Sequence, residues 1–159
     1  MKKKPTAVFT AILSAALLWG GVPAAAQPAM EPNIVVSDSS YVDGISPRLK
    51  YLSSVFTDMS IRGSRADCQG NYTTFQDVKV QLQVMLQKSS FHSSLDSDWS
   101  EVASWDLTWT GPAQKILARS YTGLTPGYYY RVKTTATVLD GNVPLETVVV
   151  HSAVSYYGG

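Results

Sequence analysis

Cysteine and histidine are scarce in this sequence, which has one Cys and two His among 159 residues. A disulfide joins two cysteines and a structural zinc site takes several Cys or His ligands, so an intrachain disulfide framework and a multi-cysteine zinc site are excluded. Charge is also scarce, because Asp, Glu, Lys and Arg make up only 16% of the chain. With 45% hydrophobic and 11% aromatic residues, we expect one compact domain rather than a disordered or polyelectrolyte chain.

The N-terminus carries the marks of a secretory signal peptide. Lysines at positions 2–4 precede an apolar run over residues 7–19, and Ala24 and Ala26 supply the small residues of a cleavage site. The run is shorter than the ~20 residues that a membrane-spanning helix needs, and no second such run follows. We therefore expect residues 1–26 to be removed, with cleavage after about Ala26, leaving a secreted bacterial protein of net charge −2 without a membrane span.

The remaining basic residues do not form a dense patch. Arg62, Arg65, Arg119, Arg131 and Lys133 are spread over segments that alternate like strands, so we expect them on a solvated sheet face. Affinity for nucleic acid comes largely from clustered Lys and Arg. We therefore expect no nucleic-acid partner.

Strand-like alternation begins after residues 27–48, a proline-bearing, aperiodic segment that we predict to be a flexible lead-in. The clearest run covers residues 78–88, where a period of two places five aliphatic side chains on one buried face. No part of the chain after the signal peptide sustains an apolar stripe at helical spacing, so helix is expected to be minor. We predict seven strands over residues 50–56, 60–69, 75–88, 101–108, 115–121, 128–139 and 145–155.

Turn signals separate these strands. Asp140 and Gly141 form a dipeptide that favours a tight hairpin between the last two strands. Short strands at this spacing are typical of a sandwich or a barrel. We predict an all-β, two-sheet antiparallel sandwich of about seven strands over residues 49–159.

Two local patterns narrow the type of sandwich. Residues 124–132, Leu-Thr-Pro-Gly-Tyr-Tyr-Tyr-Arg-Val, resemble the L-x-P-G-x-x-Y-x-V stretch of fibronectin type III domains, which implies that Tyr130 forms a tyrosine corner. Residues 66–70 resemble the second strand of an immunoglobulin domain around its first cysteine. The partner cysteine would stand at Val132, so the inter-sheet disulfide is absent and Cys68 would be a buried thiol.

The order of landmarks also resembles small secreted proteins of unknown function from Gram-positive Firmicutes. The resemblance covers residues 45–157 and implies a bacterial source and an extracellular location, but no chemistry. Its landmarks are residues 46–48, 51–54, Ala66, Cys68, 86–88, Trp99, Val102, Trp105, Gly127, 130–132, Glu146, Thr147 and Ser152.

Candidate catalytic and metal-binding residues are few. His92 lies in a Ser- and Asp-rich loop and His151 on the last strand, and we interpret both as isolated surface histidines. A loose carboxylate cluster consists of Asp96, Asp98, Glu101 and Asp106. Such a cluster would suit a glycosidase pair or a calcium site, but it lacks the spacing of a calcium loop. Since no nucleophile elbow or phosphate-binding glycine loop is present either, we expect no enzyme, no metal and no cofactor.

Aromatic residues are the main functional signal. Trp99, Trp105 and Trp109 fall within eleven residues, and in a strand Trp105 and Trp109 share a face, joined by Trp99 if no bulge intervenes. These rings either cover the core or form an exposed contact surface. Tyr129, beside the predicted corner, and residues 156–157 are further candidates for a contact surface.

We therefore interpret the chain as a secreted, non-enzymatic interaction module acting at or outside the cell envelope, with a protein or a cell-wall glycan as partner. A carbohydrate-binding or cell-wall-binding module is the first alternative, and a hydrolase that uses the carboxylate cluster is the second. If the last strand were an edge, the β-prone residues 148–150 would offer a pairing site for another chain.

Overall fold

A computed structural model describes residues 33–37, 41–43, 49–111 and 114–159. The predicted signal peptide and its cleavage site lie outside these ranges. Strands make up nearly all the regular structure of the described residues, which also contain one short 3-10 turn, η1 (Asp96–Asp98). The predicted all-β class is confirmed.

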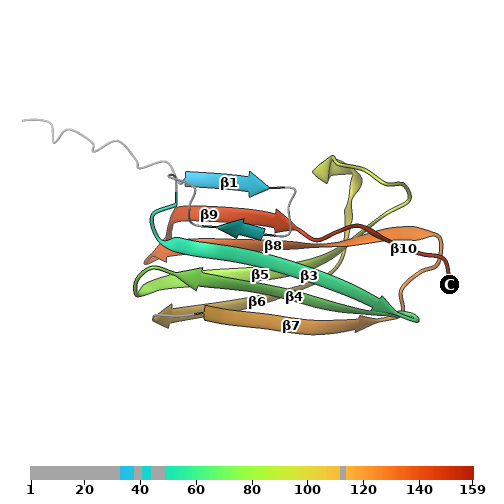
Figure 1. Cartoon of the computed structure of the whole chain (residues 1–159), viewed down its shortest axis with the longest axis horizontal. Coiled ribbons are helices and arrows are strands. Elements are labelled where there is room, and N and C mark those ends of the chain that lie inside the picture. Colours follow the sequence, from blue (N-terminus) through green and yellow to red (C-terminus); the bar gives the residue numbers. More distant parts are fainter. Residues whose placement is uncertain (1–32, 38–40, 44–48, 112–113) are drawn as a thin grey trace, which may run out of the picture.

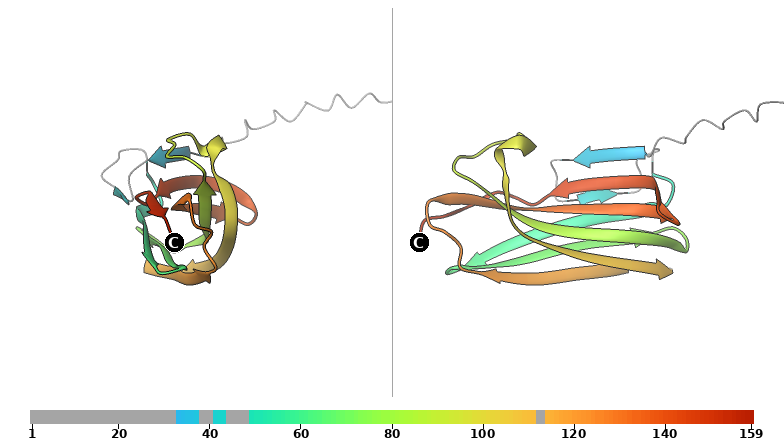
Figure 2. Two further views of the ribbon diagram at one scale, coloured as in Figure 1. Left: turned by 90° about the vertical axis from the view of Figure 1, so that its right-hand side faces the viewer. Right: turned by 180° about the vertical axis from the view of Figure 1, so that it is seen from behind.

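The strands form two sheets packed face to face (Figure 1), and the end-on view in Figure 2 shows the two layers. The six-stranded sheet has the order β1-β9-β8-β5-β6, with β10 also beside β8, and the four-stranded sheet has the order β2-β3-β4-β7. The bounds are β1 (Asn33–Ser37), β2 (Tyr41–Asp43), β3 (Leu52–Arg62), β4 (Arg65–Thr74), β5 (Val78–Ser89), β6 (Ser100–Gly111), β7 (Gln114–Thr122), β8 (Tyr128–Asp140), β9 (Val143–His151) and β10 (Ser155–Tyr157).

The seven strands β3 to β9 correspond to the seven predicted ones. They divide into β3-β4-β7 and β9-β8-β5-β6, and every neighbouring pair among them is antiparallel. The predicted antiparallel sandwich of the immunoglobulin or fibronectin type is therefore confirmed. Strands β1, β2 and β10 are additions, and β1 pairs with β9 in parallel.

Strand β5 lies at the centre of the core, because its neighbours β6 and β8 also alternate between apolar and polar residues and place apolar residues opposite those of β5. Leu82 lies opposite Leu107 of β6 and Ala136 of β8, so one face of three strands is apolar. Removing apolar surface from water stabilises a fold by roughly 25 cal/mol per Å². The fully buried members of this face on β5 are Val80, Leu82, Val84 and Leu86, and from the other sheet Leu52, Val55, Ala66, Cys68 and Tyr72 pack against them.

Two predicted strands have different bounds in the structure. The predicted bounds of the second strand, 60–69, were wrong, because β3 continues to Arg62, the chain turns at Gly63, whose φ of 57° suits glycine, and β4 begins only at Arg65. The predicted strand over 145–155 stops at His151. After a short break the chain continues as β10, which pairs with the beginning of β8 on the same side as β9, so that Ser155 lies opposite Tyr130.

Two predicted local features are present. Strands β8 and β9 form a hairpin through Asp140 and Gly141, where Gly141 has a φ of 60°. The Tyr130 hydroxyl accepts a hydrogen bond from the Thr125 amide (2.8 Å) and donates to the Thr125 carbonyl (3.1 Å), which is the geometry of a tyrosine corner. Cys68 is a free thiol with 1% of its surface exposed.

The last long strand is not an edge. Residues 148–150 of β9 pair on one side with β8 and on the other with β1. Both β1 and β2 fall within residues 27–48, so the segment predicted as a lead-in supplies a strand to each sheet.

Candidate functional site

A loop over residues 90–99 joins β5 to β6 and stands out from the sandwich near β10 (yellow in Figures 1 and 2). It contains η1, where the Trp99 amide donates to the Asp96 carbonyl (3.2 Å). The loop is rich in Ser and Asp, and its Asp96 side chain turns toward the outer face of the six-stranded sheet. The contacts of Asp96 with this face position the loop over β8.

Asp96 fastens the loop to β8 and β9. Its carboxylate pairs with the Arg131 guanidinium, with Lys133 Nζ at 2.7 Å and with His151 Nε2 at 3.1 Å. Lys133 and His151 are direct partners across β8 and β9, which brings the cationic groups together. Partial burial tends to raise the pKa of Asp96, but hydrogen bonds from Lys133 and Arg131 and the charge of His151 outweigh it and lower this pKa from 3.8 to about 2.

Arg131 is buried beneath this loop, with 3% of its surface exposed. Its Nε donates to Gln87 Oε1 (2.9 Å) and its guanidinium carbon lies 4.4 Å from the centre of the Trp99 ring. Trp99 is itself 7% exposed, and its Nε1 donates to the Ser93 carbonyl (3.1 Å). The expectation that Arg131 lies on a solvated face was therefore wrong, because the loop covers the face on which alternation correctly placed it.

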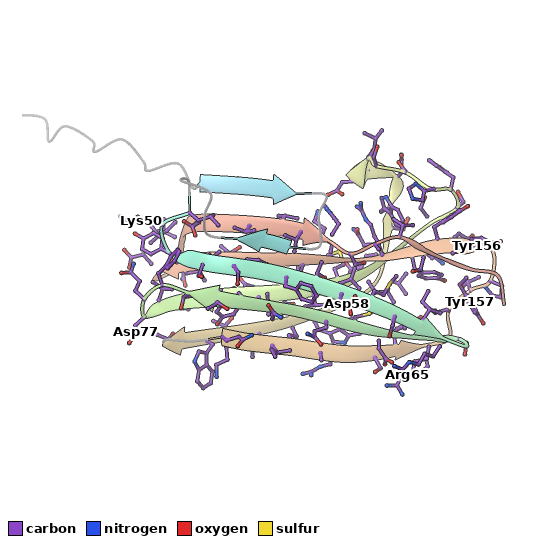
Figure 3. The ribbon with its side chains drawn as sticks, viewed as in Figure 1. Lys50, Asp58, Arg65, Asp77, Tyr156 and Tyr157 are labelled. Carbon is purple, nitrogen blue, oxygen red and sulfur yellow. The ribbon has the colours of Figure 1, made fainter. Side chains whose placement is uncertain are left out.

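Beside this buried cluster lies a group of aromatic rings, the aromatic platform, formed by Tyr129, Tyr156 and His92. Tyr156 pairs with Tyr129 across β10 and β8, and their ring centres are 5.0 Å apart. The His92 ring meets Tyr129 edge-on at 5.9 Å. Tyr156 is 57% exposed and projects at the end of the sandwich where the chain terminates (Figure 3). The platform thus presents the Tyr156 ring to solvent beside the half-buried Tyr129 ring of the paired strand, while the exposed His92 ring comes from the loop.

A hollow of about 170 Å³ adjoins the platform. It lies between the loop and the short connection from β9 to β10. Its lining is made of His92, Ser93, Ser94, Arg131, His151, Ser152 and Val154. None of these lining residues is acidic, and the surface that lines the hollow is mainly apolar.

The three predicted tryptophans do not form one surface. Trp105 and Trp109 lie opposite Val84 and Val80 on the inner side of β6, and Trp105 packs against the core. Trp109 is 45% exposed and lies under Lys115, whose Nζ is 3.6 Å from the ring centre. Trp99 precedes β6 and packs against Arg131 on the opposite face, beyond a register shift between Leu86 and Gln87 of β5.

The predicted histidine and carboxylate arrangements also differ from expectation. His151 is 4% exposed, so its interpretation as a surface histidine was wrong, while His92 is exposed. Asp98 accepts a hydrogen bond from the Ser93 hydroxyl, whereas Glu101 and Asp106 project from β6 into solvent. Over the described residues, no group of three or more His, Cys, Asp and Glu side chains is arranged to hold a metal ion.

A second concave surface lies on the outer face of the four-stranded sheet, where Figure 3 labels Asp58 and Arg65. This groove of about 490 Å³ is lined by polar groups of β3, β4 and β7. Arg65 donates to Asp67 (2.7 Å) and Ser120 (2.8 Å), and Ser120 donates to Asp67 (2.7 Å). These bonds, chiefly the one from Ser120, lower the pKa of Asp67. The hydrogen-bonding groups of Arg65, Asp67 and Ser120 are thus bonded to one another. No aromatic ring lines the groove.

Sequence reasoning singled out Tyr129 but missed its setting. Tyr129 and Tyr156 are 27 positions apart, and only the return of β10 to β8 brings them together. Asp96 stood out only as one member of a loose carboxylate cluster. The charge pattern could have predicted this contact, because Asp96 lies in a short loop between strands, and Arg131 and Lys133 stand at alternate positions of one strand and so share a face.

Among the described residues, no helix has the length and apolar character to cross a membrane. No family model and no curated protein matches the chain. Solved structures with partial likeness include CsgH of R. palustris, at 14% identity over 61% of this chain and 87% of that one, with a TM-score of 0.36. The sporulation control protein Spo0M of Bacillus subtilis aligns at 11% identity over 70% and 51%, with a TM-score of 0.40.

The CARDB domain of a Pyrococcus furiosus protein, solved in complex with di-metal ions, aligns at 12% identity over 70% of this chain and 98% of that one, with a TM-score of 0.35. Likenesses of this strength identify no family and carry nothing about ligands to this chain.

Proposed function

We propose that this protein is a secreted, non-enzymatic binding module whose contact surface is the aromatic platform. The observation that carries the proposal is the exposed Tyr156 ring held 5.0 Å from the Tyr129 ring on paired strands. Aromatic rings bury large areas at little entropic cost, because a tyrosine has few rotatable bonds and strands fix its backbone. Secretion rests on the signal-like N-terminal sequence.

A glycan is the ligand class that this surface suits best. Tyrosine rings present flat apolar faces to the faces of sugar rings, and the adjoining hollow extends this mainly apolar surface. Since the partner would lie outside the cell, a polysaccharide of the envelope is the class we propose.

A protein partner is the second candidate. Phe91 and Leu95, on the same loop as His92, are 53% and 62% exposed. Apolar side chains surrounded by polar ones are typical of protein contact surfaces. This candidate requires Phe91 and Leu95 for binding, whereas the glycan candidate requires the tyrosine rings.

Retention on insoluble matrices tests the proposal. The purified protein would be mixed with isolated Gram-positive cell walls and a panel of insoluble polysaccharides, alongside Tyr156→Ala, Tyr156→Phe and Trp109→Ala. We expect saturable retention that Tyr156→Ala loses and that Tyr156→Phe keeps, because the ring face makes the contact. Trp109→Ala is the matched control, since it removes an exposed ring distant from the platform.

The outcome separates the candidates. No retention on any matrix would rule out a glycan module. Retention lost only in Trp109→Ala would move the contact surface to the β6–β7 side. Unchanged melting temperatures of all variants, measured by circular dichroism, are needed for either conclusion.

A further inference from the structure

Strand β6 is a long free edge of the six-stranded sheet. Among the described residues it pairs with β5 on one side and with no strand on the other. In an antiparallel strand the backbone groups of alternate residues point to opposite sides, so about half of the β6 N–H and C=O groups are directed away from β5. The edge runs over residues 100–111 and forms one side of the sandwich in the end-on view of Figure 2.

The other sheet edges carry features that oppose pairing with another chain. Short edge strands, and charged side chains that point toward the interior, are common means by which sheets avoid edge-to-edge contact. Strands β1 and β2 are only five and three residues long. On β7, Lys115 and Arg119 share the face of the buried Leu117, so a strand added at that edge would enclose two positive charges.

Strand β6 has neither of these features over residues 103–111. This stretch keeps a regular register with β5, contains no proline and has Asp106 as its one charged residue. Trp109 on this stretch is 45% exposed. A regular strand edge with aromatic and β-branched residues and little charge is a template for a further strand. The inner face of this stretch, opposite aliphatic residues of β5, consists of Ala103, Trp105, Leu107 and Trp109.

The sequence of β6 is complementary to itself about Leu107. In an antiparallel pairing of two copies about a two-fold axis at Leu107, Trp105 of each copy would lie opposite Trp109 of the other. On the outer face, Asp106 would lie opposite Thr108 and not opposite its own copy, so like charges would not face each other directly. Aromatic rings would meet on the inner face, and a hydroxyl would meet a carboxylate on the outer face.

We propose that the protein forms a two-fold homodimer in which β6 pairs antiparallel with β6 of a second copy. The two six-stranded sheets would then join into one continuous sheet, and the Trp109 rings would be partly covered. A second copy fits this edge because β6 itself supplies the partners for both of its faces. The pairing does not involve the aromatic platform, so it is independent of the proposed function.

Sedimentation equilibrium of the purified protein tests the dimer. We expect an apparent mass that rises with protein concentration from one chain to two, which gives a dissociation constant. Thr108→Asp places a negative charge opposite Asp106 of the other copy, and the two-fold axis produces this contact twice. We expect it to raise the dissociation constant at least about tenfold. The neutral isostere Thr108→Asn should change the dissociation constant less than about threefold.

A charge exchange separates repulsion between the copies from a local effect on β6. Adding Asp106→Lys to Thr108→Asp gives each copy one cation and one anion that face opposite charges in the other copy. The dissociation constant of this double variant should lie within about threefold of the parent value. All variants should melt like the parent protein in dilute solution, measured by circular dichroism, because Asp106 and Thr108 are exposed.

Three results would overturn this pairing. The first is a monomer at every concentration measured. The second is a dimer with the same dissociation constant in Thr108→Asp and Thr108→Asn, and the third is a double variant that stays monomeric, since either would exclude this register of β6. Absence of glycan retention in a protein that still dimerises would overturn only the proposed function.

Discussion

The Glu146 carboxylate of β9 accepts a hydrogen bond from the backbone amide of Leu52 in β3, 2.8 Å away and across the two sheets. The Lys50 amide donates to the other carboxylate oxygen at 2.6 Å, and the Tyr51 amide lies 3.3 Å from that oxygen. Glu146 is 1% exposed, so its charge is satisfied by backbone donors rather than by water. This side chain therefore fixes the beginning of β3 against the other sheet.

Glu146→Gln is expected to lower the free energy of unfolding by about 1–3 kcal/mol. The substitution keeps the size of the side chain but replaces one acceptor oxygen with an NH₂ group that faces backbone donors. Urea denaturation followed by circular dichroism measures the change, and Glu101→Gln, on the exposed side of β6, is the control. Equal stability of the two variants would show that these backbone bonds contribute little.

Gly70→Ala is expected to destabilise the sandwich by about 1–3 kcal/mol through overpacking. A Cβ at this position would lie 2.6 Å from Val84 Cγ2 and 2.7 Å from Thr134 Oγ1, both on the facing sheet. The Thr134 hydroxyl is already bonded to Thr57 (2.8 Å), so it cannot move freely. Thermal unfolding compares this variant with Gln69→Ala, an outward-facing neighbour. A Gly70→Ala protein as stable as the parent would contradict this close contact between the sheets.

The strands could be predicted because their alternation is local. Within residues 78–88, local alternation alone predicts that Gln81 is exposed and Leu82 is buried, as the structure shows. Asp140 and Gly141 predict a hairpin from their backbone preferences alone. The turn at Gly63 was missed because the surrounding residues alternate through it, and one glycine does not reveal a positive φ in a sequence that also places Gly70 in a strand.

The candidate site could not be predicted because it depends on which segment covers which face. Alternation places Arg131 and Lys133 on the outer face of β8, but it does not show that the 90–99 loop folds over Arg131. Trp99 was expected on the same face as Trp105 only if no bulge intervened, and β5 and β6 do shift in register between Leu86 and Gln87. A shared face also assumes a continuous strand, whereas β6 begins only at Ser100.

The Cys68 thiol is expected to be unreactive in the native protein. Burial, followed by the negative charge of Asp67, raises its pKa from 9.0 to about 12. Because the folded protein holds the proton more tightly than the unfolded chain, this thiol contributes stability below pH 9 that is lost as the pH rises toward 12. At pH 8, a chromogenic disulfide reagent should label Cys68 slowly in buffer and rapidly in guanidinium chloride.

The control for this experiment is Ser100→Cys, which adds an exposed thiol at the start of β6 and should react at once. Nonreducing electrophoresis of the parent protein should show a monomer. Rapid labelling of native Cys68, or a dimer band that disappears on reduction, would contradict the buried thiol.

The contact of Asp96 with β8 and β9 should depend on acid pH. The pKa of Asp96 is lowered to about 2, so the loop contact is fully present above pH 3.8 and is lost as the pH falls toward 2. Trp99 reports on the loop because its ring stacks on Arg131, the partner of Asp96. Its fluorescence should change over this range, in a background where Trp105 and Trp109 are replaced by Phe.

Two variants test this assignment. In Asp96→Asn, the Trp99 emission at pH 7 should already equal that of the parent protein at low pH, and it should not change with pH. In Asp106→Asn, on the solvent face of β6, the emission should change with pH as in the parent protein. If the emission of Asp96→Asn changed with pH as that of the parent protein does, another carboxylate would cause the acid sensitivity. The packing of Trp99, rather than the Asp96 ion pairs, would then hold the loop.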